Sequence, residues 1–353
     1  MDGLLKDLDI DGRRIGAGYP CFIIAEAGVN HNGDMKLARN LIDAAAEAGA
    51  DAVKFQTFKA ERVSSSSAPK ADYQRQMKDP AESQLDMLQK LELTPEAHHE
   101  LLNYCRKRSI LFLSTPFDEK SVELLDEIGV PLFKIGSGEV TNRPFLEYIA
   151  RKGKPIILST GMSYLSEVDQ AVRTIRAAGC DQLILLHCVS NYPADPADVN
   201  LRAMQTLAMA FNVIVGYSDH TPGLESALGA VALGAAVIEK HLTIDKNLPG
   251  PDHKASMEPL EMASLVHGIR TLESALGDGV KISAPSEENV RRVARRSLVL
   301  KNDIRAGELI GASMLAALRP AGGIDPNLME FVVGCRTKRS IKAGQMLTWQ
   351  DLE

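Results

Sequence analysis

The sequence has few cysteines and no long apolar run. The five cysteines, at positions 21, 105, 180, 188 and 335, make an odd count with no CxxC pair, which excludes a disulfide framework and predicts reduced thiols. No stretch of about 18 consecutive apolar residues occurs, which excludes a spanning helix. The N-terminal segment MDGLLKDLDIDGRRIG lacks the basic start and apolar stretch of a secretory signal. We therefore expect a cytoplasmic protein.

The composition is that of a globular protein. Of the 353 residues 45% are hydrophobic and 24% are charged, and the formal net charge is −6, which excludes disorder and collagen-like repeats. The chain carries no long basic run, so neither nucleic acid nor a membrane is an expected partner. The length fits two ordinary domains or one large barrel with an appendage.

Short β-rich runs alternate with helical patterns from residue 21 to about 276. The helical stretches include 35–48, with apolar residues at a helical period, and 95–108, which Thr94 caps and Pro95 opens. The eight β-rich runs are 21–25, 52–56, 110–113, 132–135, 155–158, 183–186, 213–215 and 236–238. Eight strand–helix units in about 255 residues predict a (β/α)8 TIM barrel.

Polar side chains follow every predicted strand. In a barrel the C-terminal strand ends converge on one rim, where catalytic groups gather. The polar residues at these ends are Glu26, Lys54, Gln56, Ser114, Thr115, Lys134, Ser137, Glu139, Ser159, Thr160, His187, Ser218, Asp219, His220, Glu239, Lys240 and His241. So many lysines, glutamates and histidines at one rim favour a barrel with an active site over an open sheet.

The C-terminal part differs in pattern and charge. We predict a barrel domain over 1–278, a charged linker over 279–296 and a small β-rich domain over 297–353. In that last domain Ile304, Ala306 and Gly307 recur 37 positions later, which indicates two similar halves. From Lys281 onward twelve Lys or Arg stand against eight Asp or Glu, a charge of +4 that leaves −10 for the preceding part. Opposite charges suit docking of the tail on a barrel.

Two histidines at the ends of adjacent strands, His220 and His241, form a candidate site for a divalent metal. The alternative is that each is a hydrogen-bonded polar cap. Lys54 and Lys134 enter the same rim and would either form a Schiff base or hold an anion. Ser137, the serines at 159 and 218 and nearby glycines supply hydroxyl and N–H groups, which favours an anionic, phosphate-bearing substrate.

Glu26 and Glu139 suit proton transfer or sugar hydroxyls. The segment GVNHNGD follows the first strand but lacks GxGxxG spacing, which argues against a dinucleotide site. The segment LPGPDHKAS, with Asp252, either closes over the rim or is an exposed loop.

Several motifs resemble the sialic acid synthase family over nearly the whole chain. They are AEAGVNHNGD, VKFQTF, FLSTPFD, FKIGSGE, ILSTGM, GYSDHT, EKHLTID and GPDHKAS, and the tail motifs DIRAGELI and LRP resemble the antifreeze-like (SAF, β-clip) domain of these synthases. The resemblance implies a transferase that condenses phosphoenolpyruvate with an N-acetylhexosamine to give a nonulosonic acid and phosphate, by C–O cleavage and with a metal activating the aldehyde.

The resemblance also implies residue roles. A divalent metal, Mn²⁺ or alternatively Mg²⁺ or Co²⁺, would bind His220 and His241. The implied phosphoenolpyruvate ligands are Lys54, Thr115, Lys134, Ser137, Ser159, Ser190 and Ser218. The implied sugar contacts are Glu26, Gln56, Glu139, Tyr192, Asp252 and Arg319, with Glu26 as acid/base. Arg319 would come from a partner subunit, because the family forms intertwined homodimers in which the SAF domain covers the partner barrel.

Two points stay open at the level of sequence. One family type carries asparagine where this chain has Ser190, and here Asn191 stands next to Tyr192, so either residue could take that role. The GPDHKAS loop resembles N-acetylneuraminate and legionaminate synthases, and we favour N-acetylmannosamine over 2,4-diacetamido-2,4,6-trideoxymannose as the sugar. More distant alternatives are a Schiff-base lyase and a non-catalytic carbohydrate-binding barrel.

Overall fold

The computed structural model describes residues 7–65, 68 and 83–353. The chain forms two compact units, Met1–Gly277 and Asp278–Glu353, and each is described by itself.

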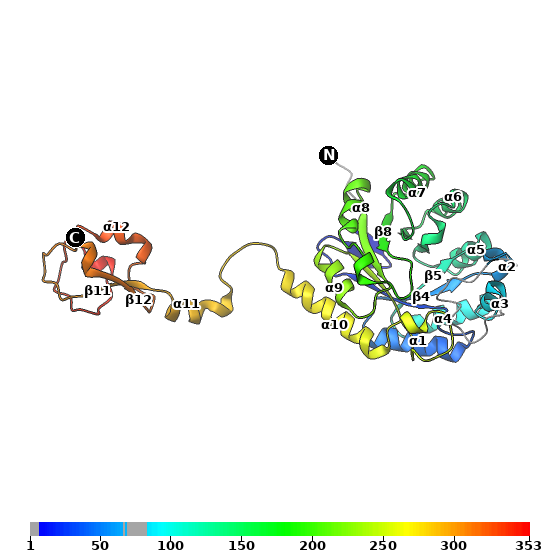
Figure 1. Ribbon diagram of the computed structural model, residues 1–353, viewed down its shortest axis with the longest axis horizontal. Coiled ribbons are helices and arrows are strands. Elements are labelled where there is room, and N and C mark those ends of the chain that lie inside the picture. The colour runs from blue at the N-terminus through cyan, green and yellow to red at the C-terminus, as the bar shows by residue number, and fades with distance from the viewer. Residues whose placement is uncertain (1–6, 66–67, 69–82) are drawn as a thin grey trace. The chain divides into compact units, whose positions relative to one another are not determined.

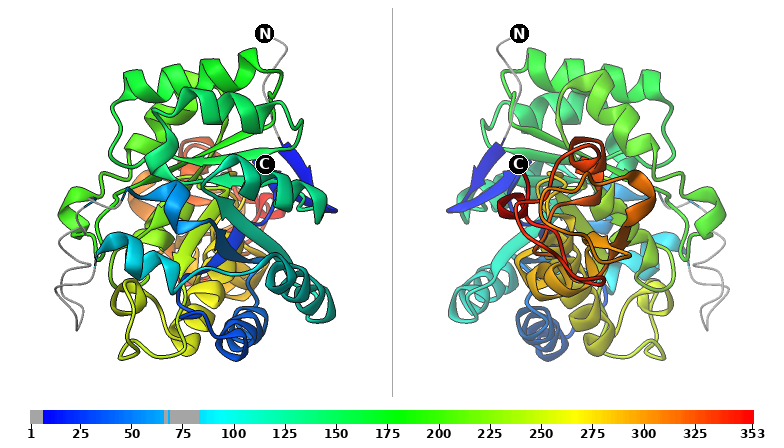
Figure 2. Two further views of the ribbon diagram at one scale, coloured as in Figure 1. Left: turned by 90° about the vertical axis from the view of Figure 1, so that its right-hand side faces the viewer. Right: turned by 90° about the vertical axis from the view of Figure 1, so that its left-hand side faces the viewer.

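The first unit is a barrel of eight parallel strands (Figures 1 and 2). The strands are β3 (Phe22–Gly28), β4 (Ala52–Thr57), β5 (Leu111–Pro116), β6 (Phe133–Ile135), β7 (Ile156–Ser159), β8 (Leu183–Cys188), β9 (Ile214–Asp219) and β10 (Val237–His241). Their order is β5-β4-β3-β10-β9-β8-β7-β6, and the two end strands, β5 and β6, contact each other. This nearly closed ring confirms the predicted TIM barrel.

Most of these strands extend further toward the rim than the sequence predicts. β9, predicted to end at residue 215, continues to Asp219, and β10, predicted to end at 238, continues to His241. An apolar run in the sequence marks only the apolar part of a strand. Here the last residues of the strands include polar side chains that pair with one another inside the barrel, so the apolar pattern does not reveal them. Many candidate site residues therefore lie on strands and not on the loops that follow them.

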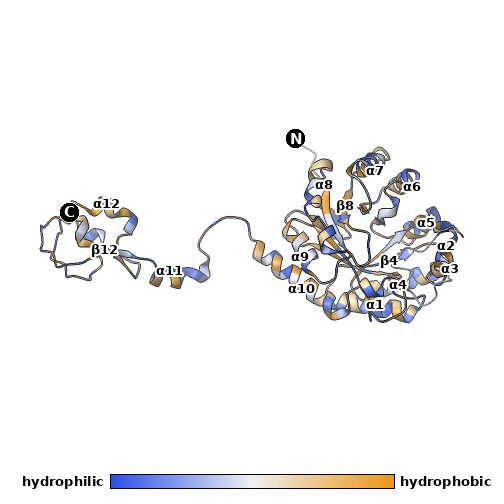
Figure 3. Ribbon diagram, in the orientation of Figure 1, coloured by the Kyte–Doolittle hydropathy of each residue, from blue (hydrophilic) through white to orange (hydrophobic). Residues whose placement is uncertain are grey.

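Amphipathic helices surround the strands. They are α1 (Met35–Glu47), α4 (Pro95–Lys107), α5 (Glu119–Glu127), α6 (Arg143–Ala150), α7 (Leu165–Ala177), α8 (Ala203–Phe211), α9 (Glu225–Ala232) and α10 (Pro259–Leu276). The helix ribbons in Figure 3 carry hydrophobic and hydrophilic colours side by side. α4 begins as predicted, with Pro95 in its first turn and the Thr94 hydroxyl accepting a hydrogen bond from the Ala97 N–H at 3.2 Å.

Two features near the barrel were not predicted. An antiparallel hairpin of β1 (Asp7–Ile10) and β2 (Arg13–Gly16) packs its apolar residues against the first residues of the barrel strands, including Phe22 and Val237. The polar rim lies at the opposite ends of these strands. Between β4 and α4 the chain also forms two short helices, α2 (Ala60–Val63) and α3 (Gln84–Gln89).

A buried ion pair stabilises the barrel wall between β9 and β10. Lys240 and Asp219 are both almost fully buried, and Lys240 Nζ lies 2.7 Å from Asp219 Oδ2. The other oxygen, Asp219 Oδ1, accepts hydrogen bonds from Tyr217 Oη and from the backbone N–H and hydroxyl of Thr221. Removing one partner of such a pair leaves an uncompensated buried charge.

Replacing this lysine should therefore destabilise the fold. We expect Lys240→Met to lower the free energy of unfolding by about 3 kcal/mol, measured by chemical denaturation. As a control, Lys246→Met breaks an exposed pair with Glu261 and should cost under about 1 kcal/mol. Equal losses in the two variants would contradict the structural role of the buried pair.

The second unit is small and β-rich, as predicted. β11 (Ser297–Leu300) pairs antiparallel with β12 (Leu315–Leu318). α11 (Glu288–Ala294) lies within the segment predicted as linker, and α12 (Met329–Val332) within the small domain. Equivalent residues of the two predicted halves, such as Ile304 and Ile341, are both buried in one core and pair with each other.

The pairing of the two halves is short. Ile304 and Ile341 form a single antiparallel bridge. A turn follows each isoleucine, since Gly307 and Gly344 both have φ of 81°, a left-handed conformation that glycine adopts readily.

Among the described residues no helix combines the length and apolar character needed to cross a membrane.

Candidate active site

Four charged side chains meet inside the barrel at its rim. Glu26 on β3, Lys54 on β4, Lys134 on β6 and Glu239 on β10 are each at most 4% exposed. Lys54 Nζ lies 2.7 Å from Glu26 Oε2 and 3.6 Å from Glu239 Oε2, and Lys134 Nζ lies 3.4 Å from Glu239 Oε1. Two lysines thus pair with two glutamates, and an incoming anion would compete with the glutamates for the lysines.

The surroundings of the cluster shift the pKa values of its four members. Burial raises the pKa of Glu26 to about 7, although Lys54 acts in the opposite direction. Burial would also raise the pKa of Glu239, but Lys134 and Lys54 lower it to about 2. Burial lowers the pKa of Lys134, whereas Glu239 and Glu26 outweigh burial at Lys54 and raise its pKa. Glu26 therefore changes its protonation near neutral pH.

Hydroxyl groups surround this cluster. Lys54 Nζ donates to Thr115 Oγ1 at 3.0 Å, and Lys134 Nζ donates to Ser159 Oγ at 2.8 Å. Ser218 Oγ donates to Glu239 Oε1 at 3.1 Å. The structure therefore brings the lysines and the predicted threonine and serines into one hydrogen-bonded group.

A second group of small polar side chains stands beside Gly161, in the loop after β7. The Gly161 N–H donates to Ser137 Oγ at 2.9 Å, and Ser137 Oγ lies 3.1 Å from Cys188 Sγ. A Cβ added to Gly161 would lie 2.2 Å from Ser190 Oγ, so only glycine allows these hydroxyls to come together. Ser190 thus lies in the same group as Ser137, while Asn191 is exposed.

The two predicted metal ligands are neighbours. The rings of His220 and His241 lie 5.5 Å apart, and the Tyr192 ring lies 4.1 Å from His220 and 5.4 Å from His241. His220 Nδ1 lies 2.7 Å from the Val189 carbonyl oxygen, which can only accept, so Nδ1 carries the proton and Nε2 offers its lone pair. Burial lowers the pKa of both histidines, and His241 Nδ1 is buried with no hydrogen-bond partner among the described residues.

These observations fit a metal site with two protein ligands. Neutral imidazoles with free lone pairs are good ligands for Mn²⁺ and related ions. Among the described residues no group of three or more His, Cys, Asp or Glu is arranged to hold a metal. The remaining ligands would therefore be water or substrate oxygens. Asp252 Oδ2 lies 4.0 Å from His241 Nδ1, and burial raises the pKa of Asp252 to about 6.

A cavity of about 230 Å³ opens next to His241 and contains three of the predicted sugar contacts, Gln56, Tyr192 and Asp252. Its other lining residues are Val29, Phe58, Val63, Gln84, Met87, Leu88, Leu91, Phe117 and Pro251. Glu139, another predicted contact, is half-buried after β6 and accepts a hydrogen bond from Asn142. Arg319 is exposed on the second unit.

Hydrogen bonds join two loops at the rim to each other. Asn30, in the GVNHNGD segment, donates to the Leu242 carbonyl at 2.9 Å and to Ser256 Oγ at 2.8 Å. His253, in the LPGPDHKAS segment, lies 2.7 Å from Thr243 Oγ1 and 3.2 Å from Asn32 Oδ1. The glycine-rich segment thus anchors the loop that carries Asp252, and Asp252 itself is buried. The alternative of an exposed loop is wrong for this residue.

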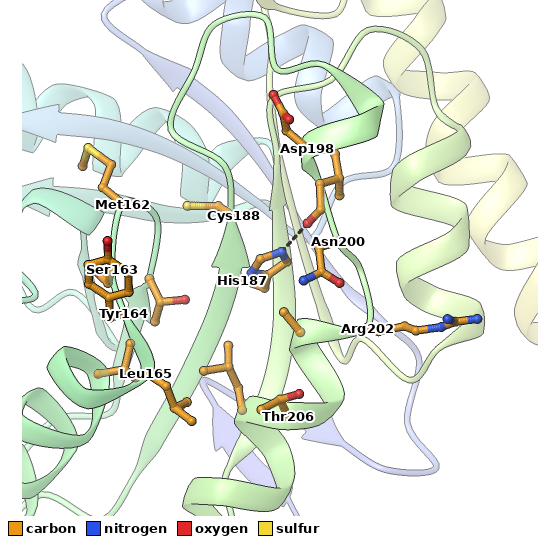
Figure 4. A pocket seen from close by; sticks show the side chains of 15 residues that line it. Met162, Ser163, Tyr164, Leu165, His187, Cys188, Asp198, Asn200, Arg202 and Thr206 are labelled. Atoms are coloured by element: carbon orange, nitrogen blue, oxygen red, sulfur yellow. Dashed lines mark hydrogen bonds between the residues drawn. The ribbon is translucent and has the colours of Figure 1, made fainter.

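A larger cavity, of about 650 Å³, lies between the loops after β7 and β8 (Figure 4). His187, which lines it, donates from Nε2 to the Val199 carbonyl oxygen at 2.6 Å. None of the residues predicted to bind substrate or metal lines this cavity. We therefore assign the site to the charged cluster, the histidine pair and the smaller cavity.

Glu239 is the main residue that the sequence interpretation did not assign to the site. It was noted among the polar strand ends, but no role was given to it. A signal was present, because Glu239 and His241 are two residues apart on one strand, and residues i and i+2 of a strand point to the same face. Lys240, between them, points to the opposite face and pairs with Asp219.

Comparisons with known proteins give a consistent picture. The model of the NeuB family matches residues 41–281, and that of the SAF domain matches residues 295–353. An N,N'-diacetyllegionaminic acid synthase of Campylobacter jejuni is 50% identical over 327 residues, covering 92% of this chain and 98% of its own. One of Legionella pneumophila is 48% identical over 342 residues, covering 96% of each chain.

A solved structure supports the fold. The N-acetylneuraminic acid synthetase of Leptospira borgpetersenii aligns with a TM-score of 0.72 and 38% identity, covering 80% of this chain and 94% of its own.

Proposed function

The chain belongs to the NeuB family and is a nonulosonic acid synthase, and on that premise we propose that its sugar substrate is 2,4-diacetamido-2,4,6-trideoxymannose, the precursor of a legionaminic acid. The observation that carries this choice is the identity of 50% and 48%, over nearly the whole chain, to two proteins named as N,N'-diacetyllegionaminic acid synthases. A relative named for N-acetylneuraminic acid is 38% identical. We therefore revise the preference for N-acetylmannosamine that the sequence motifs favoured.

The second substrate in this proposal is phosphoenolpyruvate, held by the lysine–hydroxyl group. Lys54 and Lys134 offer two buried cations, each next to a hydroxyl, and these suit a small molecule that carries a carboxylate and a phosphate. The serines beside Gly161 supply further donors on the same rim. Binding of the anion displaces the lysines from the glutamates with which they pair.

The reaction forms one carbon–carbon bond. C3 of phosphoenolpyruvate attacks the aldehyde carbon of the open-chain sugar, and the aldehyde oxygen takes up a proton. Water adds to C2 and loses one proton, which leaves a hydroxyl group on C2. The C2–O bond to phosphate then breaks as this hydroxyl becomes the C2 carbonyl, so that phosphate leaves with the bridging oxygen and takes up the hydroxyl proton. Glu26, buried beside Lys54, is the group placed to move a proton during these steps.

A divalent metal on His220 and His241 would supply electrophilic assistance where negative charge develops on the aldehyde oxygen. Tyr192, Asp252 and Gln56 stand around the same cavity as His241, and they would orient the sugar so that its carbonyl end faces the histidines.

The sugar assignment is tested by comparing substrates side by side. With phosphoenolpyruvate and Mn²⁺ present, we expect kcat/KM for the trideoxy sugar to exceed that for N-acetylmannosamine by at least about 10²-fold, because a site that hydrogen-bonds a substrate group rejects analogues that lack it. Phosphate release and mass spectrometry of the product report turnover. A higher kcat/KM for N-acetylmannosamine would overturn the assignment.

The pKa of Glu26 predicts a pH dependence of phosphoenolpyruvate binding. The anion draws Lys54 away from Glu26, so the pKa of Glu26 rises above its value of about 7 in the free protein. The complex then holds more protons than the free protein, and phosphoenolpyruvate affinity should fall as pH rises from 7.5 to 9. The phosphate itself is fully ionised over that range, because its second pKa is about 6.

Calorimetric titration in two buffers of different ionisation enthalpy measures this proton uptake directly. Glu26→Gln should bind phosphoenolpyruvate without proton uptake and with a flatter pH profile. Proton uptake that persists in Glu26→Gln would show that another group titrates.

We also propose that the protein acts as an intertwined homodimer in which the SAF domain of one subunit covers the barrel of the other. Arg319 is exposed on a tail whose charge is opposite to that of the barrel part, which supports docking on an acidic surface. In that arrangement its guanidinium would contact the acetamido group of the sugar.

Arg319→Ala should raise KM for the sugar by about tenfold or more, the value of one hydrogen bond to a charged group, and should leave KM for phosphoenolpyruvate within about twofold. Arg305→Ala, which changes another exposed arginine of the tail, is the matched control. Equal increases in both KM values for Arg319→Ala would contradict the sugar contact.

A further inference from the structure

The small cavity next to His241 has two sides of different chemistry. On one side stand His241 with Tyr192, whose rings lie 5.4 Å apart, and Asp252, 4.0 Å from His241. On the other side, Val29, Phe58, Met87 and Leu91 are buried in one apolar cluster, against which Leu88 and Phe117 pack. The apolar side is therefore a continuous hydrocarbon surface in the same cavity as His241.

This apolar side offers few hydrogen bonds. Apart from Gln56, Tyr192, His241 and Asp252, the polar side chain among the described lining residues is Gln84. Its Oε1 already accepts from Ser64 Oγ at 2.8 Å. A hydroxyl group placed against this cluster would lose water and meet no hydrogen-bonding side chain among the residues that form it, which is unfavourable. A methyl group there would gain by leaving water.

We propose that the α2–α3 wall of this cavity, formed by Val63, Met87, Leu88 and Leu91, selects sugars whose C6 is a methyl group over those that carry a C6 hydroxyl. The inference rests on the proposed function, because it assumes that the aldehyde end of the sugar faces His241. A hexose held in this way directs its far end toward the apolar cluster. The short helices between β4 and α4 thus act as the specificity-determining element.

The size of the effect follows from general limits on selectivity. An apolar pocket rejects a ligand that adds a hydroxyl by about 10²-fold. The wild-type protein should therefore prefer 2,4-diacetamido-2,4,6-trideoxymannose to its 6-hydroxy counterpart, 2,4-diacetamido-2,4-dideoxymannose, by about 10²-fold in kcat/KM. Because these two sugars share both acetamido groups, the ratio of their kcat/KM values reports the effect of the group at C6 alone.

Two variants place a hydrogen-bonding group in the wall. Leu88→Gln changes a half-buried residue of α3, and Val63→Thr is a nearly isosteric change at a residue that is 41% exposed, so the fold should tolerate it. Each should reduce the preference for the 6-deoxy sugar by about tenfold and leave KM for phosphoenolpyruvate unchanged. Leu165→Gln, on the wall of the larger cavity, and Val290→Thr, at an exposed valine of α11, should keep the wild-type ratio.

The outcomes separate the two proposals. Turnover of the trideoxy sugar with a ratio near one, or a ratio that neither Leu88→Gln nor Val63→Thr changes, would overturn the selection by the wall and leave the proposed function intact. No turnover of any of these sugars by the wild-type protein would overturn the proposed function and the inference together.

Discussion

Replacing Lys134 by methionine should lower kcat/KM for phosphoenolpyruvate by about 10³-fold. Methionine has a similar length and no charge, so the variant keeps the packing and loses the cation that lies 2.8 Å from Ser159 Oγ and 3.4 Å from Glu239 Oε1. The cluster then has one cation for two glutamates, so it attracts an anionic substrate less strongly. A loss of about 4 kcal/mol, within the range for removing one partner of a buried charge pair between two bound molecules, corresponds to about 10³-fold.

Lys240→Met is the matched control for this prediction. Both lysines are nearly fully buried and each pairs with a carboxylate, but Lys240 points away from the barrel interior. The control should lose stability and keep KM for phosphoenolpyruvate close to the wild-type value. The opposite pattern, a large increase in KM only for Lys240→Met, would place the anion site elsewhere. Steady-state kinetics at saturating sugar measure both variants.

Replacing His241 by alanine should remove nearly all metal-stimulated turnover. Its Nδ1 is buried with no hydrogen-bond partner among the described residues, and burial lowers the pKa of His241 well below the usual value, so the ring is neutral and suited to bind a cation. With only His220 left, we expect metal affinity to fall by at least about 10²-fold, and turnover with Mn²⁺ to fall by about 10³-fold.

Metal binding followed by calorimetry gives a readout that does not depend on turnover. His187→Ala is the matched control. It removes a histidine near the end of β8, whose ring hydrogen-bonds to the Val199 carbonyl oxygen, and it should keep the metal response. A His241→Ala variant that binds and responds to Mn²⁺ like the wild-type protein would contradict the ligand assignment.

The sequence predicted the barrel because its strands are apolar runs separated by helical patterns, and the order of eight units leaves few alternatives. The rim residues followed from the same pattern, since residues at the ends of parallel strands converge. The β1–β2 hairpin was not predicted, because its apolar residues are buried against distant residues of the barrel strands. The helices α2 and α3 were not predicted, because at four and six residues they are too short to show a helical period.

The site shows the same limit at the level of single residues. Lys54 and Lys134 are recognisable in the sequence because each interrupts an apolar strand. The role of Glu239 is visible only in the structure, where the pairing of the strands places it between both lysines. The hydrogen bonds that hold the Asp252 loop, from Asn30 to Leu242 and between His253 and Asn32, join residues more than 200 positions apart. Pairings across that separation depend on barrel closure, and local sequence patterns do not contain them.

The most direct test of the central claim traces the bridging oxygen of phosphoenolpyruvate. With ¹⁸O at the C2–O–P bridge, the account predicts that turnover with 2,4-diacetamido-2,4,6-trideoxymannose releases phosphate that carries the label, one phosphate for each nine-carbon acid formed. The label retained in the acid, or a borohydride-trapped adduct on Lys54 or Lys134, would contradict condensation by C–O cleavage at this rim.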